Sequence, residues 1–202
     1  MDGGGTARII VGLGNPDRKY KFTRHNVGFW VIDELVRRWG LGGGRKRFHS
    51  RIWAAPRDGQ TVILAQPQTY MNRSGLAAAE LAGFYRPDPS AVLVVLDDMA
   101  LPPGRLRARA DGSSGGHRGL ADVIAALGSE RVSRLRIGIG SPPPRMDAAD
   151  FVLSRFAQSE RELMAQAVAR AADAAADWLR LDIAGVMGRY NRDPSKEGGK
   201  EL

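Results

Sequence analysis

The sequence predicts an α/β fold, a single three-layer domain in which a twisted, mixed and mostly parallel sheet is flanked by helices. Apolar segments of strand length alternate along the chain with segments whose apolar residues recur at helical spacing. The run at 91–96, Ala-Val-Leu-Val-Val-Leu, contains no polar residue, which is typical of a strand covered on both faces. A length of 202 residues suits one domain with one core.

Strands are expected where apolar or alternating residues stand between turn-forming residues such as Gly, Pro and Asp. In chain order these segments are 7–11, a hairpin within 51–65, 91–96, 105–109 and 135–139. The hairpin is predicted to turn at Arg57-Asp58-Gly59-Gln60, between two runs of strand-forming residues.

Helices are expected where apolar residues recur every three or four positions. In chain order these segments are 27–39, 74–86, 120–127 and 159–181. Side chains at 23–26 are expected to cap the first helix, and Ser159 with Glu162 predicts a capping box for the last. The domain is therefore expected to span 7–190, between a flexible N-terminus at 1–6 and a flexible polar tail at 191–202.

The composition excludes several classes of protein. The chain has no Cys, so it holds no disulfide framework, thiol nucleophile, Cys-ligated zinc or iron–sulfur cluster, and we expect a cytoplasmic protein. The first residues lack the basic and apolar segments of a signal peptide. No apolar run approaches the roughly 18 residues of a membrane span, so neither secretion nor a membrane is expected.

A formal charge of +8 hints at a polyanionic partner, and several arginines are arranged in rows. Arg105, Arg107 and Arg109 alternate with apolar residues, so an extended strand would place their guanidinium groups on one face. Arg134 and Arg136 repeat the arrangement before the apolar end of the next expected strand. A solvated strand face and a phosphate-binding face both account for this pattern.

Two glycine-rich motifs match known site sequences only in part. The Gly-x-Gly at 12–14 lacks the third small residue of a dinucleotide-binding fingerprint, because Asp17 stands at that position. The Gly-x-Ser-x-Gly at 112–116 has the spacing of a nucleophile elbow, but the strand before it carries arginines instead of being buried. We therefore interpret Ser114 as a loop residue and consider a dinucleotide oxidoreductase a distant alternative.

General acid–base chemistry is the remaining candidate. The three histidines, His25, His49 and His117, are dispersed without the helical spacing of metal ligands, so no metal is expected. His25 lies in a polar loop, where a capping or surface role is the alternative. Asp97 ends the most apolar strand, where open α/β sheets collect ligand-binding groups, and a turn residue is the alternative there. If the two side chains meet, Asp97 would orient the imidazole and His25 would activate water.

Several multi-residue motifs follow one another along the chain. In order they are Gly12-Leu13-Gly14-Asn15-Pro16, Tyr20, Thr23-Arg24-His25-Asn26-x-Gly28, Gln66-Pro67-Gln68-Thr69-Tyr70-Met71-Asn72-x-Ser74-Gly75, Asp97-Asp98, Leu101-Pro102-Pro103-Gly104, Gly115-Gly116-His117-x-Gly119-Leu120 and Arg134-Leu135-Arg136-Ile137-Gly138-Ile139-Gly140. In this order and spacing they resemble the bacterial-type peptidyl-tRNA hydrolase family. The resemblance extends from about Arg8 to Tyr190, and the ordered set is far more specific than any single motif.

The resemblance implies a monomeric enzyme that hydrolyses the ester bond between a peptide and the 3′ end of tRNA, without metal or cofactor, and so recycles tRNA from stalled translation. By the matching positions, His25 would be the general base and Asp97 its orienting partner. Asn15 would sense the blocked amino group of the peptide, and Asn72 would bind substrate or the attacking water.

The resemblance also implies the residues that bind substrate. The residues expected to line the channel for the peptide and the acceptor end are Tyr20, Asn26, Tyr70, Met71, Gly115 and His117. Arg107, Arg109 and Arg136 stand where the family carries basic residues that grip tRNA phosphates, in agreement with the arginine rows. Such contacts would give affinity that is largely independent of tRNA sequence and weakens with salt.

One position departs from the family pattern. Arg118 follows His117 where the family usually has Asn. Arginine can only donate hydrogen bonds and is permanently charged, so we expect Arg118 to contact a phosphate or ribose of the acceptor end.

The main rival hypothesis is a non-catalytic RNA-binding relative with the same fold. Asn15, His25, Asn72 and Asp97 argue against it, because phosphate binding alone does not require this set.

Overall fold

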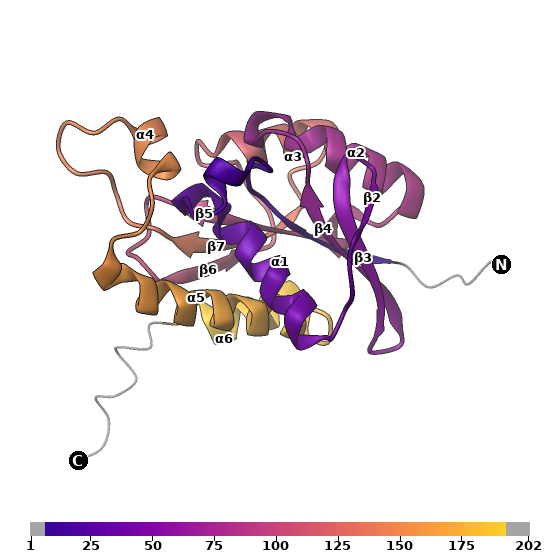
Figure 1. The fold of residues 1–202 in the computed structure, drawn as a ribbon. Helices are drawn as coiled ribbons and strands as arrows, with labels where there is room; N and C mark the ends of the chain where they lie inside the picture. Colours follow the sequence, from indigo (N-terminus) through magenta and orange to yellow (C-terminus); the bar gives the residue numbers. More distant parts are fainter. Residues whose placement is uncertain (1–6, 193–202) are drawn as a thin grey trace, which may run out of the picture.

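The computed structural model describes residues 7–192; the expected flexible segment 1–6 and residues 193–202 of the expected tail lie outside this range. The described residues form a mixed seven-stranded sheet with the strand order β2-β3-β4-β1-β5-β7-β6. The neighbours β4, β1, β5 and β7 run parallel, whereas β2–β3, β3–β4 and β6–β7 pair antiparallel. The predicted α/β fold class, with a mostly parallel sheet between helices, is confirmed (Figure 1).

The central strands are apolar on both faces because helices cover both sides of the sheet. The strands are β1 Arg8–Gly12, β2 Arg45–Arg47, β3 Ser50–Arg57, β4 Gln60–Pro67, β5 Val92–Asp98, β6 Leu106–Arg109 and β7 Ser133–Gly138. In β1, Ile10 faces one hydrophobic cluster while its neighbours Ile9 and Val11 face the other, since successive side chains of a strand point to opposite faces.

The helices form two layers. The α-helices are α1 Val27–Arg38, α2 Ser74–Tyr85, α3 Arg118–Leu127, α4 Ala148–Leu153, α5 Gln158–Asp177 and α6 Ile183–Tyr190. One cluster joins the sheet to α1, α5 and α6, and the other joins it to α2 and α3 on the opposite face (Figure 1). Within 7–192, no helix is both long and apolar enough to cross a membrane.

The parallel arrangement gathers polar loops at one edge of the sheet. The strands β1, β4 and β5 all end at this edge, because they run in the same direction. Short 3-10 turns at Arg18–Tyr20, Arg24–Asn26 and Met71–Arg73 follow the ends of β1 and β4. The carboxyl ends of parallel strands are where open α/β sheets bind ligands, so this edge is the place to look for a site.

Glycines at 12–14 permit close packing of β1 against α1. A Cβ atom at Gly12 would collide with the backbone oxygen of Gly28, which lies in the first turn of α1. A Cβ atom at Gly14 would stand 2.6 Å from the ring of Phe29. The Gly-x-Gly motif therefore has a packing role, which explains its presence without a dinucleotide.

The predicted helix caps are wrong in detail. No side chain caps α1, because the amide of Asn26 binds the backbone of Asn15 instead. The long helix α5 begins at Gln158, and it is Glu160, not Glu162, that accepts the backbone N–H of Ala157 at 2.8 Å. Tertiary contacts decide both caps. The Asn26 side chain is used by Asn15, and Glu160 is held in place by an ion pair with Arg24.

Three elements were not predicted from the sequence: β2, α4 and α6. Strand β2 consists of three charged residues without alternation, and α4 has only six residues, too few to show a helical period. Asn191, where the polar tail was expected to begin, follows α6 directly. Its side chain exchanges two hydrogen bonds, of 2.6 and 3.1 Å, with the backbone of Ala108 in β6.

Candidate active site

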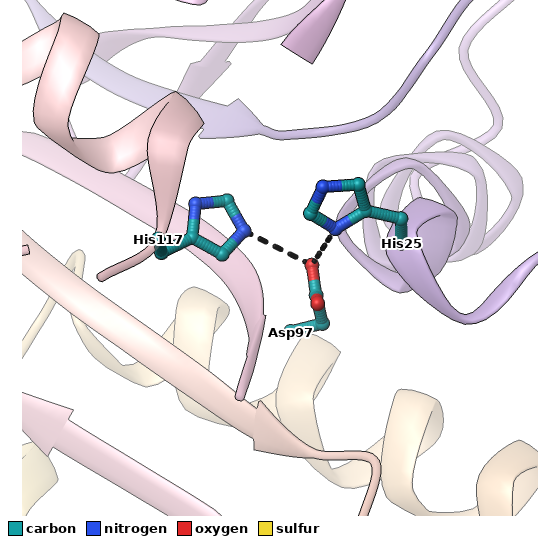
Figure 2. Close-up of side chains that lie close together, drawn as sticks. All are labelled: His25, Asp97 and His117. Atoms are coloured by element: carbon teal, nitrogen blue, oxygen red, sulfur yellow. Dashed lines mark hydrogen bonds and ion pairs between the residues drawn. The ribbon is translucent and has the colours of Figure 1, made fainter. Parts of the chain in front are cut away.

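At the carboxyl end of β5, Asp97 contacts two histidines through one oxygen atom. The Nδ1 atom of His25 lies 2.7 Å from Oδ1 of Asp97, and Nε2 of His117 lies 3.1 Å from the same oxygen (Figure 2). Three elements converge here: Asp97 is the next-to-last residue of β5, His25 stands in the 3-10 turn before α1, and His117 precedes α3. The side chains of His25 and Asp97 are therefore in contact, which is the condition that the sequence analysis set for general-base chemistry at His25.

Hydrogen bonding fixes which nitrogen of each imidazole can act as a base. His117 accepts the backbone N–H of Leu120 at its Nδ1 atom, 3.2 Å away, so its proton resides on Nε2 and is donated to Asp97. His25 donates from Nδ1 to the same carboxylate, which leaves its Nε2 atom as an unprotonated acceptor. Of the two histidines that contact Asp97, only His25 therefore has a basic nitrogen without a hydrogen bond to residues 7–192.

Asp97 is held as an anion although it is 3% exposed. Burial by itself raises the pKa of this carboxyl group, but the attraction of His117 and His25 and their hydrogen bonds outweigh it. The net effect is a pKa below the ordinary value for aspartate. An anion in this position orients the imidazole of His25 and stabilises its protonated form.

The turn that carries His25 is anchored by its buried neighbour Arg24. The Arg24 guanidinium donates to both carboxylate oxygens of Glu160, at 3.0 and 2.7 Å, and to the backbone oxygen of Ile139 at 3.1 Å. It also lies over the rings of Phe151 and Phe156, with its central carbon 4.5 and 4.4 Å from their centroids. Bidentate pairing and ring stacking hold arginine in one geometry, so the position of His25 is defined by the core.

A second polar group lies beside the histidines and is built from two asparagines. The backbone N–H of Asn15 donates to Oδ1 of Asn26 at 3.0 Å, and Nδ2 of Asn26 donates to the backbone oxygen of Asn15 at 2.9 Å. The Oδ1 atom of Asn15 accepts the backbone N–H of Met71 at 2.9 Å. Because its oxygen is occupied, Asn15 presents its NH₂ group as a hydrogen-bond donor.

Both polar groups border one pocket of about 640 Å³. Of the residues expected from the sequence, those that line it are Asn15, Tyr20, His25, Tyr70, Met71, Asn72, Asp97, Gly115, His117, Arg118 and Arg136. Asn26 does not line this pocket; it is 2% exposed and supports Asn15 from behind. Arg107 and Arg109 are exposed on β6 and also lie outside the pocket lining.

The two arginine rows differ from the expected arrangement. Arg107 stands opposite Arg136 in the β6–β7 register, so these two do share a face of the sheet. Arg105 precedes β6, and its guanidinium donates to the backbone oxygen of Asn191 at 2.5 Å. Arg134 is 1% exposed and donates to backbone oxygens of four residues, including Gly112 at 2.6 Å. The prediction that Arg105 and Arg134 belong to a row of outward-facing cations is therefore wrong, because folded backbone captures both.

Arg136 and Arg118 both line the pocket, but they differ in whether their guanidinium groups are held by hydrogen bonds to other residues. Arg136 is tied down by Oδ2 of Asp98 at 3.2 Å and by the backbone oxygen of Ser114 at 3.2 Å. Arg118 is the first residue of α3 and is exposed, and its side chain forms no hydrogen bond or ion pair with the residues at 7–192. The guanidinium of Arg118 is thus available to a ligand, and its contact with a phosphate or ribose of the acceptor end stays a prediction.

Sequence reasoning missed the apolar wall of the pocket. This wall comes from α4 and from the turn after β5, and its members are Met99, Ala100, Ala148, Ala149, Val152 and Leu153. The one available signal was Asp147, whose side chain accepts the backbone N–H of Ala149 at 2.8 Å and caps α4. Small apolar residues carry no chemical signature in a sequence. Their role as a pocket wall therefore follows only from the position of α4, whose residues line the same pocket as the histidines.

The same three side chains lie close enough together to be compared with a metal site. The ligand atoms of His25, Asp97 and His117 lie within 4.8 Å of one another, a spacing that a metal ion can bridge. A metal-bound imidazole nitrogen must carry no proton, yet Nε2 of His117 is protonated when Nδ1 accepts from Leu120. The geometry therefore fits a hydrogen-bonded carboxylate and imidazole pair better than a metal centre.

Comparisons with known proteins agree with the motifs. The family model described as peptidyl-tRNA hydrolase matches residues 9–198. A protein named peptidyl-tRNA hydrolase from Rhodopirellula baltica is 44% identical over 184 residues, which cover 91% of this chain and 97% of the relative. A relative of the same name from Chloroflexus aurantiacus is 46% identical, covering 91% and 98% of the two chains.

Solved structures show the same similarity. A crystal structure of peptidyl-tRNA hydrolase from Acinetobacter baumannii matches with a TM-score of 0.81 and 34% sequence identity, covering 93% of this chain and 95% of that chain. A variant of the Acinetobacter baumannii protein matches with a TM-score of 0.86, 34% identity and the same coverage of both chains.

Proposed function

The chain belongs to the peptidyl-tRNA hydrolase family, and on that basis we propose that it hydrolyses the ester bond between a peptide and the 3′-terminal ribose of tRNA. The observation that carries the proposal is the 2.7 Å contact between His25 and Asp97 at the floor of a pocket that also presents the amide of Asn15. An RNA-binding relative without activity would need neither an oriented base nor a buried anion.

His25 acts as the general base. Its free Nε2 atom accepts a proton from a water molecule, and the resulting hydroxide attacks the ester carbonyl carbon. The tetrahedral intermediate then collapses, the bond from carbon to the ribose oxygen breaks, and the imidazolium of His25 returns the proton to that oxygen. Asp97 supports both steps, because an adjacent anion stabilises the imidazolium and keeps the Nδ1 proton in place.

Asn15 distinguishes a blocked substrate from an unblocked one. Its NH₂ group can donate to the peptide carbonyl that is joined to the amino group of the last residue. Ordinary aminoacyl-tRNA has a positively charged amino group there, with no carbonyl to accept. Asn72, exposed on the pocket lining, provides a further amide for the substrate or the attacking water.

The tRNA is held on the side of the pocket where β6 and β7 lie. Arg107 and Arg109 project from β6 into solvent, and Arg136 lies beside Arg107 at the pocket wall. These three guanidinium groups bind phosphates of the acceptor stem, and Arg118 binds a phosphate or ribose nearer the 3′ end. We propose that the enzyme works as a monomer in the cytoplasm, with no metal or cofactor.

The direct test is a hydrolysis assay with N-acetylaminoacyl-tRNA. We expect the protein to release free tRNA and the N-acetylamino acid, and to act at least an order of magnitude more slowly on the same tRNA carrying an unblocked amino acid. Binding of the blocked substrate without release of product would identify an RNA-binding module and overturn the proposal.

A further inference from the structure

A basic and aromatic segment borders the pocket on the side away from β6. The 3-10 turn after β1 and the two residues that follow it read Arg18-Lys19-Tyr20-Lys21-Phe22, with no acidic residue among them. We call this segment, together with Arg155, the aromatic rim. Nothing in the proposed mechanism requires Phe22, Lys21 or Arg155.

Two aromatic rings in or next to the aromatic rim are unusually exposed for their size. Phe22, within the rim, is 55% exposed, and Tyr70, which lines the pocket as Tyr20 does, is 51% exposed. Tyr70 is fixed there by a hydrogen bond of 2.8 Å from its hydroxyl to Oδ2 of Asp17. Two flat surfaces therefore stand in solvent at or beside the pocket mouth, although the structure offers apolar cores in which such rings are usually buried.

Cations accompany these rings. The ammonium of Lys19 lies 4.8 Å from the ring centroid of Tyr20, and Lys21 lies 5.3 Å from that of Phe22. The guanidinium of Arg155 lies 5.9 Å from the Phe22 ring. Among the described residues none of these three cations forms an ion pair with a carboxylate, so their charge is available to an anion.

Backbone contacts place Phe22 beside the pocket. Tyr20, two residues earlier, lines the pocket, and the backbone N–H of Thr23 donates to the oxygen of Tyr20 at 3.0 Å. Thr23 forms a β-bridge with Arg155, which follows the pocket-lining residue Leu153 by two positions. The rim is thus continuous with the pocket wall and lies within a few residues of His25.

We propose that the aromatic rim stacks the unpaired nucleotides at the 3′ end of tRNA, next to the terminal ribose whose ester enters the pocket. Rings alternating with cations fit bases alternating with phosphates, and stacking on aromatic side chains is tolerant of base identity. A nascent peptide varies from one substrate to the next, so it offers no constant partner for four positive charges. The inference rests on the proposed function, because it assigns a part of that substrate to this surface.

In this arrangement two surfaces bind different parts of the tRNA, one the duplex and the other the single-stranded 3′ end. Arg107, Arg109 and Arg136 lie on β6 and β7, whereas the aromatic rim lies on the loop between β1 and α1. The first surface has charge without exposed rings and suits the phosphates of a duplex. The rim has both and suits a single strand.

The test compares the binding of two uncharged tRNAs, one intact and one lacking its last three nucleotides. We expect Phe22→Ala to weaken binding of the intact tRNA by roughly 5- to 150-fold, the range that loss of one base-stacking side chain produces, and to leave binding of the shortened tRNA unchanged. Phe22→Tyr should restore the binding of intact tRNA. Phe84→Ala is the matched control, since Phe84 is 53% exposed and also carries an arginine over its ring, but lies on α2 away from the pocket.

Equal effects of Phe22→Ala on the two tRNAs, no effect on either, or the same loss in Phe84→Ala would overturn the inference. A loss that appears only with tRNA carrying a long peptide, and not with uncharged tRNA, would identify the peptide as the occupant and also overturn it. The assay does not depend on hydrolysis, so a protein that binds through Phe22 but releases no product would refute the proposed function alone.

Discussion

His25 and His117 contact the same oxygen of Asp97 with different ring nitrogens, Nδ1 in one and Nε2 in the other. The second nitrogen of His117 accepts a backbone N–H, whereas the second nitrogen of His25 has no hydrogen bond to the described residues. Their ring centroids are 5.1 Å apart, so the two imidazoles share one environment but differ in proton position. This difference supports the proposal that His25 transfers the proton while His117 supports Asp97.

Replacing Asp97 with Asn should abolish most of the activity. An amide can donate to Nδ1 of His25 and thereby move the imidazole proton to Nε2, where it blocks acceptance of a proton from water. We expect kcat to fall by about 10³- to 10⁴-fold, as for loss of the orienting carboxylate in other triads, while KM changes little. Steady-state kinetics with N-acetylaminoacyl-tRNA would measure this, with the exposed Asp88→Asn as control. Retention of the full rate would show that Asp97 does not orient His25.

Replacing Asn15 with Asp should change substrate selection. An aspartate keeps an oxygen to accept the Met71 N–H, but offers the pocket a second acceptor in place of the NH₂ donor. The ratio of kcat/KM for blocked over unblocked aminoacyl-tRNA should therefore fall at least tenfold, because the new charge attracts a free ammonium group. An unchanged ratio would mean that Asn15 does not read the blocked amino group. Asn72→Asp, at the other amide of the pocket, shows whether an added charge alone has this effect.

Replacing Arg118 with Asn should weaken tRNA binding. Arg118 lines the pocket, is exposed and has no partner among residues 7–192, so the substitution removes a cation without disturbing the fold. We expect the Kd for tRNA at low salt to rise several-fold. Arg131→Asn provides the control, because Arg131 is exposed just before β7, at the opposite end of the sheet. An unchanged Kd for the Arg118 variant would remove this residue from the binding surface.

Neutralising Arg107 or Arg109 should reduce the salt dependence of tRNA binding. Each lost phosphate contact lowers the slope of log Kd against log salt by about 1. Arg107→Gln and Arg109→Gln are therefore expected to show smaller slopes than the wild type. Arg134→Gln should keep the wild-type slope and instead unfold at lower denaturant concentration, because four residues lose a hydrogen bond to a buried guanidinium. A smaller slope in this third variant would contradict the assignment of Arg134 to the fold.

The fold was predictable because its strongest signals are local. The uninterrupted apolar run at 91–96 predicts a strand covered on both faces, and β5 is covered in this way. The hairpin turn at Asp58 and Gly59 was also predicted, and both residues adopt positive φ angles, of 48° and 75°. Short or charged elements such as β2 and α4 carry no periodic signal, since their positions are set by what they pack against.

The candidate site was predictable only in part, because the sequence does not show which of its side chains the folded backbone covers. The ordered motifs predicted that His25 and Asp97 act as a pair, and in the structure their side chains are in contact. Exposure of a side chain, however, depends on the backbone that folds over it. The sequence gives Arg134 and Arg136 the same spacing as Arg107 and Arg109, yet the loop at 112–114 captures the first pair.

The most direct test of the central claim is the rate of His25→Ala on N-acetylaminoacyl-tRNA. His49→Ala is the matched control, because His49 also contacts a carboxylate, Glu80 at 2.8 Å, but lies outside the pocket. We expect His25→Ala to lose at least about 10²-fold in kcat while it binds tRNA as the wild type does, and His49→Ala to keep the wild-type rate. Undiminished turnover by His25→Ala would show that His25 is not the general base.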